Sequence, residues 1–197
     1  MRPASIGHQT NMILRFFRRD DGRATIERLY GAIVAQSRDP AFFTDFAVPD
    51  TIAGRFEMIL VHAFALFHRL KGEPEERRTL GQHVFDEFCR DMDSNLREMG
   101  VGDLTVPKKM KRVAEAFYGR AGVYDAALAA DDNAALEDAL MRNVYGSDAA
   151  RAGEARRLAS YVRNLTATLA TQSFDRLAAG EIAFPAATPA PIAEITP

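Results

Sequence analysis

The sequence has few of the residues that build disulfide frameworks or thiolate metal centres. Among 197 residues it has one cysteine, Cys89, and no tryptophan. A single thiol excludes an internal disulfide and any metal site that needs several thiolates, and it favours a reducing compartment. An excess of basic charge is also missing, because 25 lysines and arginines face 27 aspartates and glutamates. The surface as a whole is therefore not that of a nucleic-acid-binding protein.

No apolar run is long enough to cross a membrane or to direct secretion. The best transmembrane candidate, residues 58–67, has ten residues and contains His62, whereas a spanning helix needs about 20. The first 19 residues carry four arginines and no acidic residue, and Arg15 interrupts the apolar run that a secretory signal requires. This start is compatible with an organellar presequence, a basic amphipathic helix at an anionic membrane or an ordinary first helix, and Met12 is an alternative start.

The motifs of common enzyme classes are missing as well. No histidine follows a glutamate by three residues, as a di-iron bundle requires, and there is no zinc-protease motif, nucleophile elbow or phosphate loop. The pair Gly100 and Gly102 lacks the third glycine of a dinucleotide fingerprint, so we interpret it as a tight helix connection. Cys89 has apolar neighbours and is expected in the core.

One enzymatic alternative is a polar pocket formed by His62, Asp86, Asp93 and Arg97. A solvated helix face explains the two aspartates more simply, because each of them precedes an arginine by four residues. His62 or His68 could ligate a haem iron. A lone histidine on an apolar helix face is more often a core residue with its hydrogen bonds satisfied.

Helical periodicity extends along almost the whole chain. Apolar residues recur at steps of three and four, and no window shows a sustained alternation of β-branched residues. Helices are expected at residues 26–34, 52–70, 75–99, 105–128, 134–144, 149–171 and 173–179. The pattern predicts an all-α fold, a single irregular bundle of about six to seven helices.

The chain is expected to divide into three parts. Residues 1–21 form a basic N-terminal segment, residues 22–180 form the helical domain, and residues 181–197 form a disordered tail. The tail is predicted from its composition, since residues 184–197 contain four prolines, which interrupt helices.

Two neighbouring features are typical of a recognition surface. A polar stretch at residues 91–107, which contains a tight turn, precedes a basic block, Lys108, Lys109, Lys111 and Arg112. At 100° per residue the block lies mostly on one polar helix face, with Lys109 nearer the flank. Such a block is often only a solubilising face.

The charge distribution and one glycine favour the interpretation of this region as a recognition surface. Residues 73–104 carry nine acidic and four basic side chains, net -5, and residues 105–123 carry five basic and one acidic, net +4. Opposed patches of this kind suit a client or a membrane surface. Gly119 would cost about 1 kcal/mol relative to alanine inside a helix, so it predicts the close approach of another backbone.

Three short sequences in this region, LREMGVGD at 96–103, VPKKM at 106–110 and FYGR at 117–120, carry a family resemblance. They resemble the ubiquinol-cytochrome c chaperone family, the assembly factors of the cytochrome bc1 complex, and in particular its short bacterial members. The resemblance covers roughly residues 22–171. The matching positions and the basic block together give the expected client- or partner-binding residues: Asp93, Arg97, Glu98, Gly102, Asp103, Lys108, Lys109, Lys111, Arg112, Tyr118, Gly119, Arg120 and Tyr124.

The resemblance implies a non-catalytic chaperone without a cofactor, which binds newly made cytochrome b and supports assembly of the bc1 complex (complex III). Its expected partners are apo-cytochrome b and a small co-chaperone, with peripheral contact to a membrane or a ribosome and no direct DNA binding. The expected location is the bacterial cytoplasm, including the periphery of the inner membrane, or the mitochondrial matrix in a eukaryote. The alternative function is a ribosome- or RNA-associated helical module that uses the basic face from Lys108 to Arg112.

Overall fold

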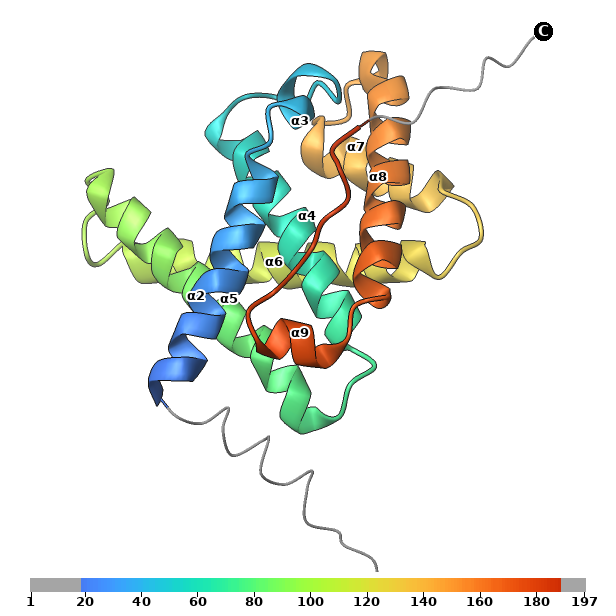
Figure 1. Ribbon diagram of the computed structural model, residues 1–197. Helices are drawn as coiled ribbons and strands as arrows, with labels where there is room; N and C mark the ends of the chain where they lie inside the picture. Colours follow the sequence, from blue (N-terminus) through green and yellow to red (C-terminus); the bar gives the residue numbers. More distant parts are fainter. Residues whose placement is uncertain (1–18, 189–197) are drawn as a thin grey trace, which may run out of the picture.

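The computed structural model describes residues 19–188, and every regular element in this range is a helix. The elements are α2 (Arg19–Ser37), α3 (Ala41–Thr44), α4 (Ile52–Leu70), α5 (Glu75–Glu98), α6 (Val106–Leu128), α7 (Ala134–Val144), the short 3-10 helix η1 (Ala149–Arg151), α8 (Ala152–Ala170) and α9 (Phe174–Ala178) (Figure 1). The predicted all-α fold is confirmed. Most of the basic N-terminal segment, residues 1–18, and the end of the predicted tail, residues 189–197, lie outside the described residues.

Local chemistry sets the start of α4 and the end of α5. The Thr51 hydroxyl accepts a hydrogen bond from the Gly54 N–H at 3.1 Å, as an N-cap residue does. At the end of α5, Gly100 has a φ of 79°, and the Val101 N–H donates to the Leu96 carbonyl at 3.0 Å. This is the Schellman ending that glycine favours, and it turns the chain into the connector, residues 99–105.

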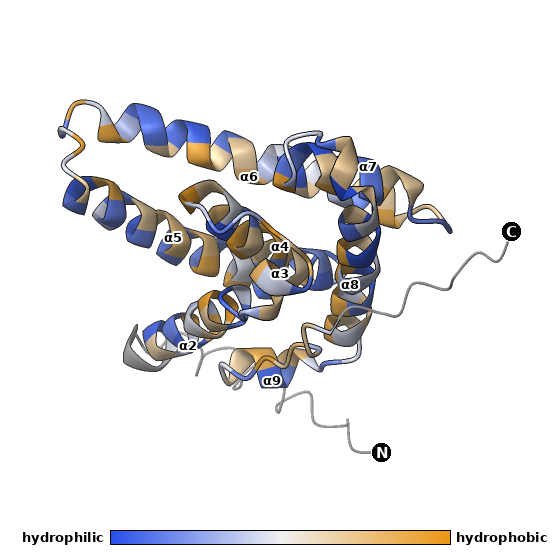
Figure 2. Ribbon diagram, turned by 90° about the horizontal axis from the view of Figure 1, so that it is seen from above, coloured by the Kyte–Doolittle hydropathy of each residue, from blue (hydrophilic) through white to orange (hydrophobic). Residues whose placement is uncertain are grey.

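The central helix of the bundle is α4. Helices α2, α5, α6 and α8 pack around it (Figure 2), and every residue from Met58 to Leu66 is buried. A helix that is apolar on all sides needs partners on all sides, so α4 determines where its neighbours lie. The packing reaches the backbone at Gly54, where a Cβ would lie 2.0 Å from the Pro49 carbonyl oxygen. No helix within residues 19–188 combines the length and the hydropathy that a membrane span needs.

Helices α5 and α6 form a hairpin whose outer half projects from the bundle. Near the bundle the two helices share an aromatic contact, in which the Phe85 and Phe117 ring centroids are 4.8 Å apart, and Phe67 of α4 lies 5.0 Å from Phe117. Among residues 93–116 only Val106 is buried. Both helices run past the other elements to the connector at their far end (Figure 2). The hairpin therefore presents a large surface that the core does not use.

Residues 181–188 form an extended strap that crosses α4 between α2 and α8 (Figure 1). The Gln172 side chain donates to the Ala183 carbonyl at 2.8 Å and accepts from the Ala183 N–H at 2.9 Å. Gln36 donates to the Pro185 carbonyl at 3.3 Å, and the Phe184 ring lies 5.6 Å from the His62 ring. Residues 181–188 were expected to belong to a disordered tail, but they are packed on the bundle. Proline keeps this backbone out of a helix, and two glutamine side chains supply its hydrogen-bond partners instead.

Candidate functional site

The residues expected to bind a client do not line one pocket. One set lies at the outer end of the hairpin, a second forms a basic face on the first turns of α6, and a third lies where α6 meets the bundle. Each set has different contacts, so each has a different role in the molecule.

At the outer end of the hairpin, Arg97 lies between two carboxylates. Its Nε donates to Asp93 at 2.6 Å, and its Nη1 donates to Asp103 in the connector. These carboxylates, Asp93 above all, raise the pKa of the Arg97 guanidinium. Glu98 accepts a hydrogen bond from Ser94 at 3.3 Å. The predicted pair of Asp93 and Arg97 is confirmed within α5, and the second contact of Arg97, with Asp103, joins the last turn of α5 to the connector.

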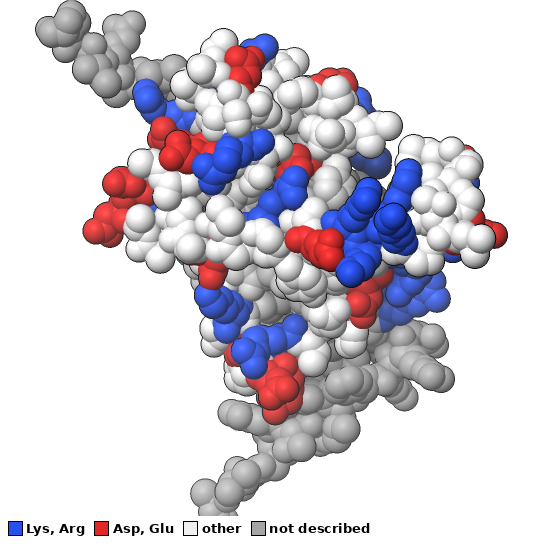
Figure 3. Space-filling model, turned by 180° about the vertical axis from the view of Figure 1, so that it is seen from behind, with Lys and Arg blue, Asp and Glu red and all other residues white. Residues whose placement is uncertain are grey.

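The basic face of α6 consists of Lys108, Lys109, Lys111 and Arg112. All four are exposed, and lysine and arginine side chains gather near the projecting end of the hairpin (Figure 3). Lys111 lies 3.7 Å from Glu115, one helical turn on. Within the described part of the chain, no ion pair involves Lys108, Lys109 or Arg112. Three cations are thus left for an external anionic group.

Arg120 faces inward and belongs to the packing between α6 and α4. Its Nε and Nη2 donate to the two carboxylate oxygens of Glu57 at 2.6 and 2.5 Å, and its Nη1 donates to the Ala116 carbonyl at 3.3 Å. Glu57 is buried, which raises the pKa of its carboxyl, while the bond from Arg120 acts in the opposite direction. This two-point ion pair fixes the hairpin to the central helix.

The two tyrosines of the family motif have different environments. Tyr124 is fully buried and accepts a hydrogen bond from the Asn143 amide at 3.1 Å, and burial raises the pKa of its hydroxyl to about 12. Tyr118 is 51% exposed, with its ring beside Phe85 and Phe117 at 5.2 and 5.4 Å. Tyr124 is therefore a structural residue, whereas Tyr118 presents half of an aromatic ring to the outside.

The interpretation of Gly119 as a point of close backbone approach is wrong. A Cβ built at Gly119 meets no atom within 4 Å, and the same holds for Gly102. Both glycines lie in the exposed part of the hairpin, where no described element covers them. Helix propensity alone cannot indicate whether a helical glycine faces a neighbour or solvent.

His62 is a core residue with both ring nitrogens in hydrogen bonds. Nδ1 lies 2.7 Å from the Met58 carbonyl, and Nε2 lies 2.8 Å from the Tyr161 hydroxyl. Because a carbonyl oxygen can only accept, Nδ1 carries the proton and Nε2 accepts from Tyr161. Burial lowers the pKa of the imidazole to about 4, so the ring is neutral at pH 7. Neither nitrogen is left to ligate a haem iron.

The polar pocket of the enzymatic alternative is not formed. His62 is enclosed in the bundle, whereas Asp86 is exposed on α5 and accepts a hydrogen bond from Gln82 at 2.8 Å. Asp93 and Arg97 lie at the outer end of the hairpin. Over residues 19–188 no three or more His, Cys, Asp or Glu side chains are grouped as they would be around a metal ion.

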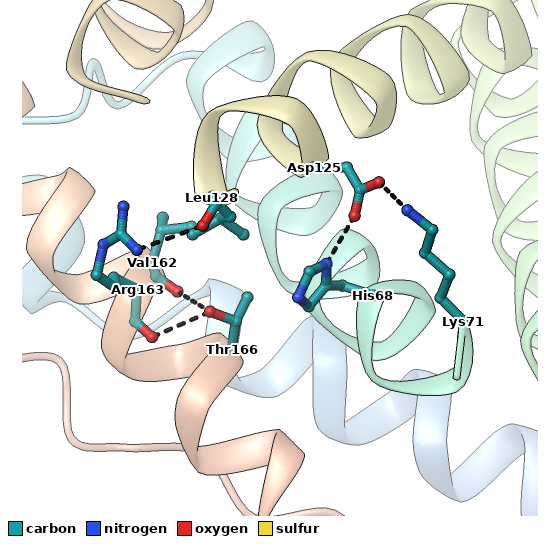
Figure 4. A network of polar contacts seen from close by, with 7 residues as sticks. All are labelled: His68, Lys71, Asp125, Leu128, Val162, Arg163 and Thr166. Carbon is teal, nitrogen blue, oxygen red and sulfur yellow. Dashed lines mark hydrogen bonds and ion pairs between the residues drawn. The ribbon is translucent and has the colours of Figure 1, made fainter. Parts of the chain in front are cut away.

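One polar network at the junction of α4, α6 and α8 was not predicted from the sequence (Figure 4). His68 Nδ1 lies 2.8 Å from Asp125, and Lys71 pairs with the same carboxylate. Arg163 of α8 donates to the Leu128 carbonyl at 3.5 Å and to Asn133 at 2.6 Å, so it covers the end of α6. The spacing of His68 and Lys71, one helical turn, was the only sequence signal for the first contact.

Two exposed apolar residues at the hairpin end were also missed. Leu104 is 97% exposed and Met99 is 58% exposed. Both lie in the connector, which composition identifies only as polar. The signal that could have found them is their position, since a leucine between an aspartate and a threonine in a turn has no helical partner to pack on.

The comparisons with known proteins agree on one family. The family model described as ubiquinol-cytochrome C chaperone matches residues 44–184. The crystal structure of the Cbp3 homolog from Brucella abortus superposes with a TM-score of 0.78 at 43% identity, over 89% of this chain and 98% of that one.

More distant relatives are named as assembly factors of the ubiquinol-cytochrome-c reductase complex. The ubiquinol-cytochrome-c reductase complex assembly factor 1 of Xenopus laevis is 26% identical over 156 residues, which cover 79% of this chain and 78% of the frog protein. The Homo sapiens protein of that name is 25% identical over 158 residues, or 80% of this chain. The match spans 52% of the human protein and 46% of the Mus musculus one, so the chain corresponds to about half of each.

Proposed function

The chain belongs to the ubiquinol-cytochrome c chaperone family, and we propose that it binds newly made cytochrome b through its α5–α6 hairpin during assembly of the bc1 complex. The family consists of assembly chaperones and not of enzymes, so we assign no catalytic residue. The observation that carries the proposal is the match over residues 44–184, which includes the whole hairpin.

The surface chemistry of the hairpin supports this choice of client. A membrane protein that has not yet been assembled presents apolar helices with basic cytoplasmic loops. The hairpin offers partly exposed apolar side chains beside an acidic stretch, residues 73–104, which includes α5 and carries net -5. The half-exposed ring of Tyr118 lies on α6, the other helix of the hairpin. A client with both features can therefore contact both helices of the hairpin.

The first test asks whether the chain is needed for assembly. Deletion of its gene is expected to lower both cytochrome b and assembled bc1 complex in membranes, and the wild-type chain is expected to restore them. Replacing Lys108, Lys109 and Lys111 by glutamate is expected to restore less, because it alters a face of the hairpin that includes two positions of the family resemblance. Normal bc1 levels after deletion would contradict the proposal.

A matched control separates surface charge in general from this surface in particular. The control replaces three exposed arginines by glutamate: Arg78, on the part of α5 near the bundle, and Arg38 and Arg142, which lie outside the hairpin. This triple variant is expected to leave assembly normal. Thermal unfolding of both variants should match the wild type, so that any loss of bc1 complex reports binding and not misfolding.

The second test asks whether cytochrome b itself is the client. A photoreactive benzoylphenylalanine at Tyr118 is expected to cross-link newly made cytochrome b, whereas the same group at Arg142 is expected not to. Suppose that deletion lowers the bc1 complex but the hairpin gives no cross-link. The assembly role would then stand, and cytochrome b would be excluded as the direct client of the hairpin. A small co-chaperone remains a prediction without a surface assigned to it.

A further inference from the structure

The hairpin ends in a small apolar projection, which we call the tip and define as residues 99–109. Leu104 is 97% exposed and Met99 is 58% exposed, the two largest apolar exposures on the hairpin. The tip lies at the far end of two helices that run past the rest of the molecule, with hydrophobic residues in the connector itself (Figure 2). Apolar side chains are thus held away from the core on a convex end.

The exposure of Leu104 belongs to a hydrogen-bonded turn. Gly100 closes α5, and the Thr105 N–H donates to the Gly102 carbonyl at 2.8 Å. The next residue, Val106, is fully buried and anchors the start of α6. Leu104 therefore points outward while the residues around it are fixed by backbone hydrogen bonds and packing.

Basic side chains lie directly behind the apolar ones. Residues 97–112 include five basic and two acidic side chains, net +3, and one of the two acidic residues, Asp103, is paired with Arg97. Lys108 and Lys109 are exposed on the first turn of α6, and no ion pair involves them among the described residues. An apolar end with cations behind it matches the order of a bilayer surface, in which acyl chains lie beneath phosphate groups.

We propose that the tip binds anionic lipid bilayers, with Leu104 and Met99 inserted among the lipids and Lys108 and Lys109 at the lipid phosphates. A protein partner fits less well, because a stable protein interface buries about 800 Å² on each side, and two side chains on a convex end offer far less. Lipid requires no shape complementarity. This inference concerns a surface of the chain itself and does not depend on which client the hairpin binds.

The test uses the absence of tryptophan from the chain. In the full-length Leu104→Trp variant, the indole is the only one present, and its emission is expected to shift to the blue with vesicles of phosphatidylcholine and phosphatidylglycerol. Vesicles of phosphatidylcholine alone are expected to give a smaller shift. The matched control is Ile52→Trp, because Ile52 is 77% exposed at the start of α4, and its emission should stay unchanged.

The reporter is specific to position 104, which matters because residues 1–19 carry four arginines that can attract anionic lipids independently. In the otherwise native chain, replacing Leu104 and Met99 by serine is expected to lower the partition coefficient about tenfold. Replacing Lys108 and Lys109 by glutamine is expected to lower it about thirtyfold at low salt. The Ile52→Ser variant should bind vesicles as the wild type does.

The outcomes that overturn the proposal are specific. Unchanged emission from position 104 with both vesicle types would exclude insertion of the tip. A shift that appears only when polyuridylic acid is added would assign the basic residues to RNA. Equal shifts at positions 104 and 52 would indicate non-specific adsorption and would also overturn it.

Discussion

Arg120 of α6 and Glu57 of α4 are joined by two parallel hydrogen bonds of 2.6 and 2.5 Å, at the point where the hairpin leaves the bundle. Glu57 is buried, and Arg120 is its only charged hydrogen-bond partner among residues 19–188. The pair therefore links the orientation of the hairpin to the central helix.

Removing one partner of this pair is expected to destabilise the fold. Arg120→Ala should lower the free energy of unfolding by about 3 kcal/mol, because it leaves a buried carboxylate without its counter-ion. Urea denaturation measures the change. The comparison is Arg97→Ala, whose pairs are exposed and should contribute less than about 1 kcal/mol. Combining Arg120→Met with Glu57→Leu should recover most of the loss, and a failure to recover would contradict this account.

The buried histidine makes stability depend on pH. The pKa of His62 is lowered from 6.5 to about 4, so the unfolded state takes up the proton first as the pH falls. The neutral imidazole makes its full contribution to the free energy of unfolding above pH 6.5, and this contribution is lost as the pH falls toward 4. Between pH 7 and pH 5 the free energy of unfolding should fall by about 2 kcal/mol on this account. The His62→Gln variant should show a flatter pH profile, and an unchanged slope would exclude His62 as the cause.

The open surroundings of Gly119 predict a stabilising substitution. A Cβ at this position meets no atom within 4 Å. Gly119→Ala should therefore raise the free energy of unfolding by about 1 kcal/mol through helix propensity alone. A binding partner that covers this face would reveal itself differently, since the same variant would then be stable and yet impaired in bc1 assembly.

Gly54 is expected to behave in the opposite way. Its missing Cβ would lie 2.0 Å from the Pro49 carbonyl oxygen, and a backbone atom cannot move aside as a side chain can. Gly54→Ala should lower the free energy of unfolding by at least about 2 kcal/mol. Thermal unfolding of the two alanine variants side by side gives the comparison, and a neutral Gly54→Ala would mean that the chain before α4 shifts freely.

The strap is predicted to depend on Gln172. Gln172→Ala removes both hydrogen bonds to Ala183, which should lower the free energy of unfolding by about 2 kcal/mol. Amide hydrogen exchange should rise in residues 181–188 before it rises in the helices. Gln82→Ala, an exposed glutamine on α5, is the matched control and should change neither quantity. Unaltered protection of the strap would show that Phe184 and its neighbours hold it without Gln172.

Local signals in the sequence predicted much of the fold. Thr51 and Gly100 identify a helix start and a helix end because capping depends on a few adjacent residues. The pair of Asp93 and Arg97 was predictable for the same reason, since four residues make one helical turn. The family resemblance placed these residues in one region, and the family match confirms the family.

Contacts between distant segments could not be predicted in this way. Arg120 was expected at a binding surface, yet it bonds Glu57, 63 residues away, and no local pattern specifies that pairing. Gly119 was misinterpreted because its environment depends on which face of α6 the bundle covers. Proline content favoured disorder for the strap, whereas Gln36 and Gln172 supply its partners from elements far earlier in the chain.

The strap also links the centre of the bundle to a segment near the other end of the described residues. Gln36 and Pro185, which it brings together, are 149 residues apart, and the Phe184 ring lies edge-on to the His62 ring at 5.6 Å. The neutral state of an imidazole on α4 therefore depends in part on a segment outside the helices. Loosening the strap should raise the pKa of His62 toward its ordinary value, so the histidine acts as an internal reporter of strap docking.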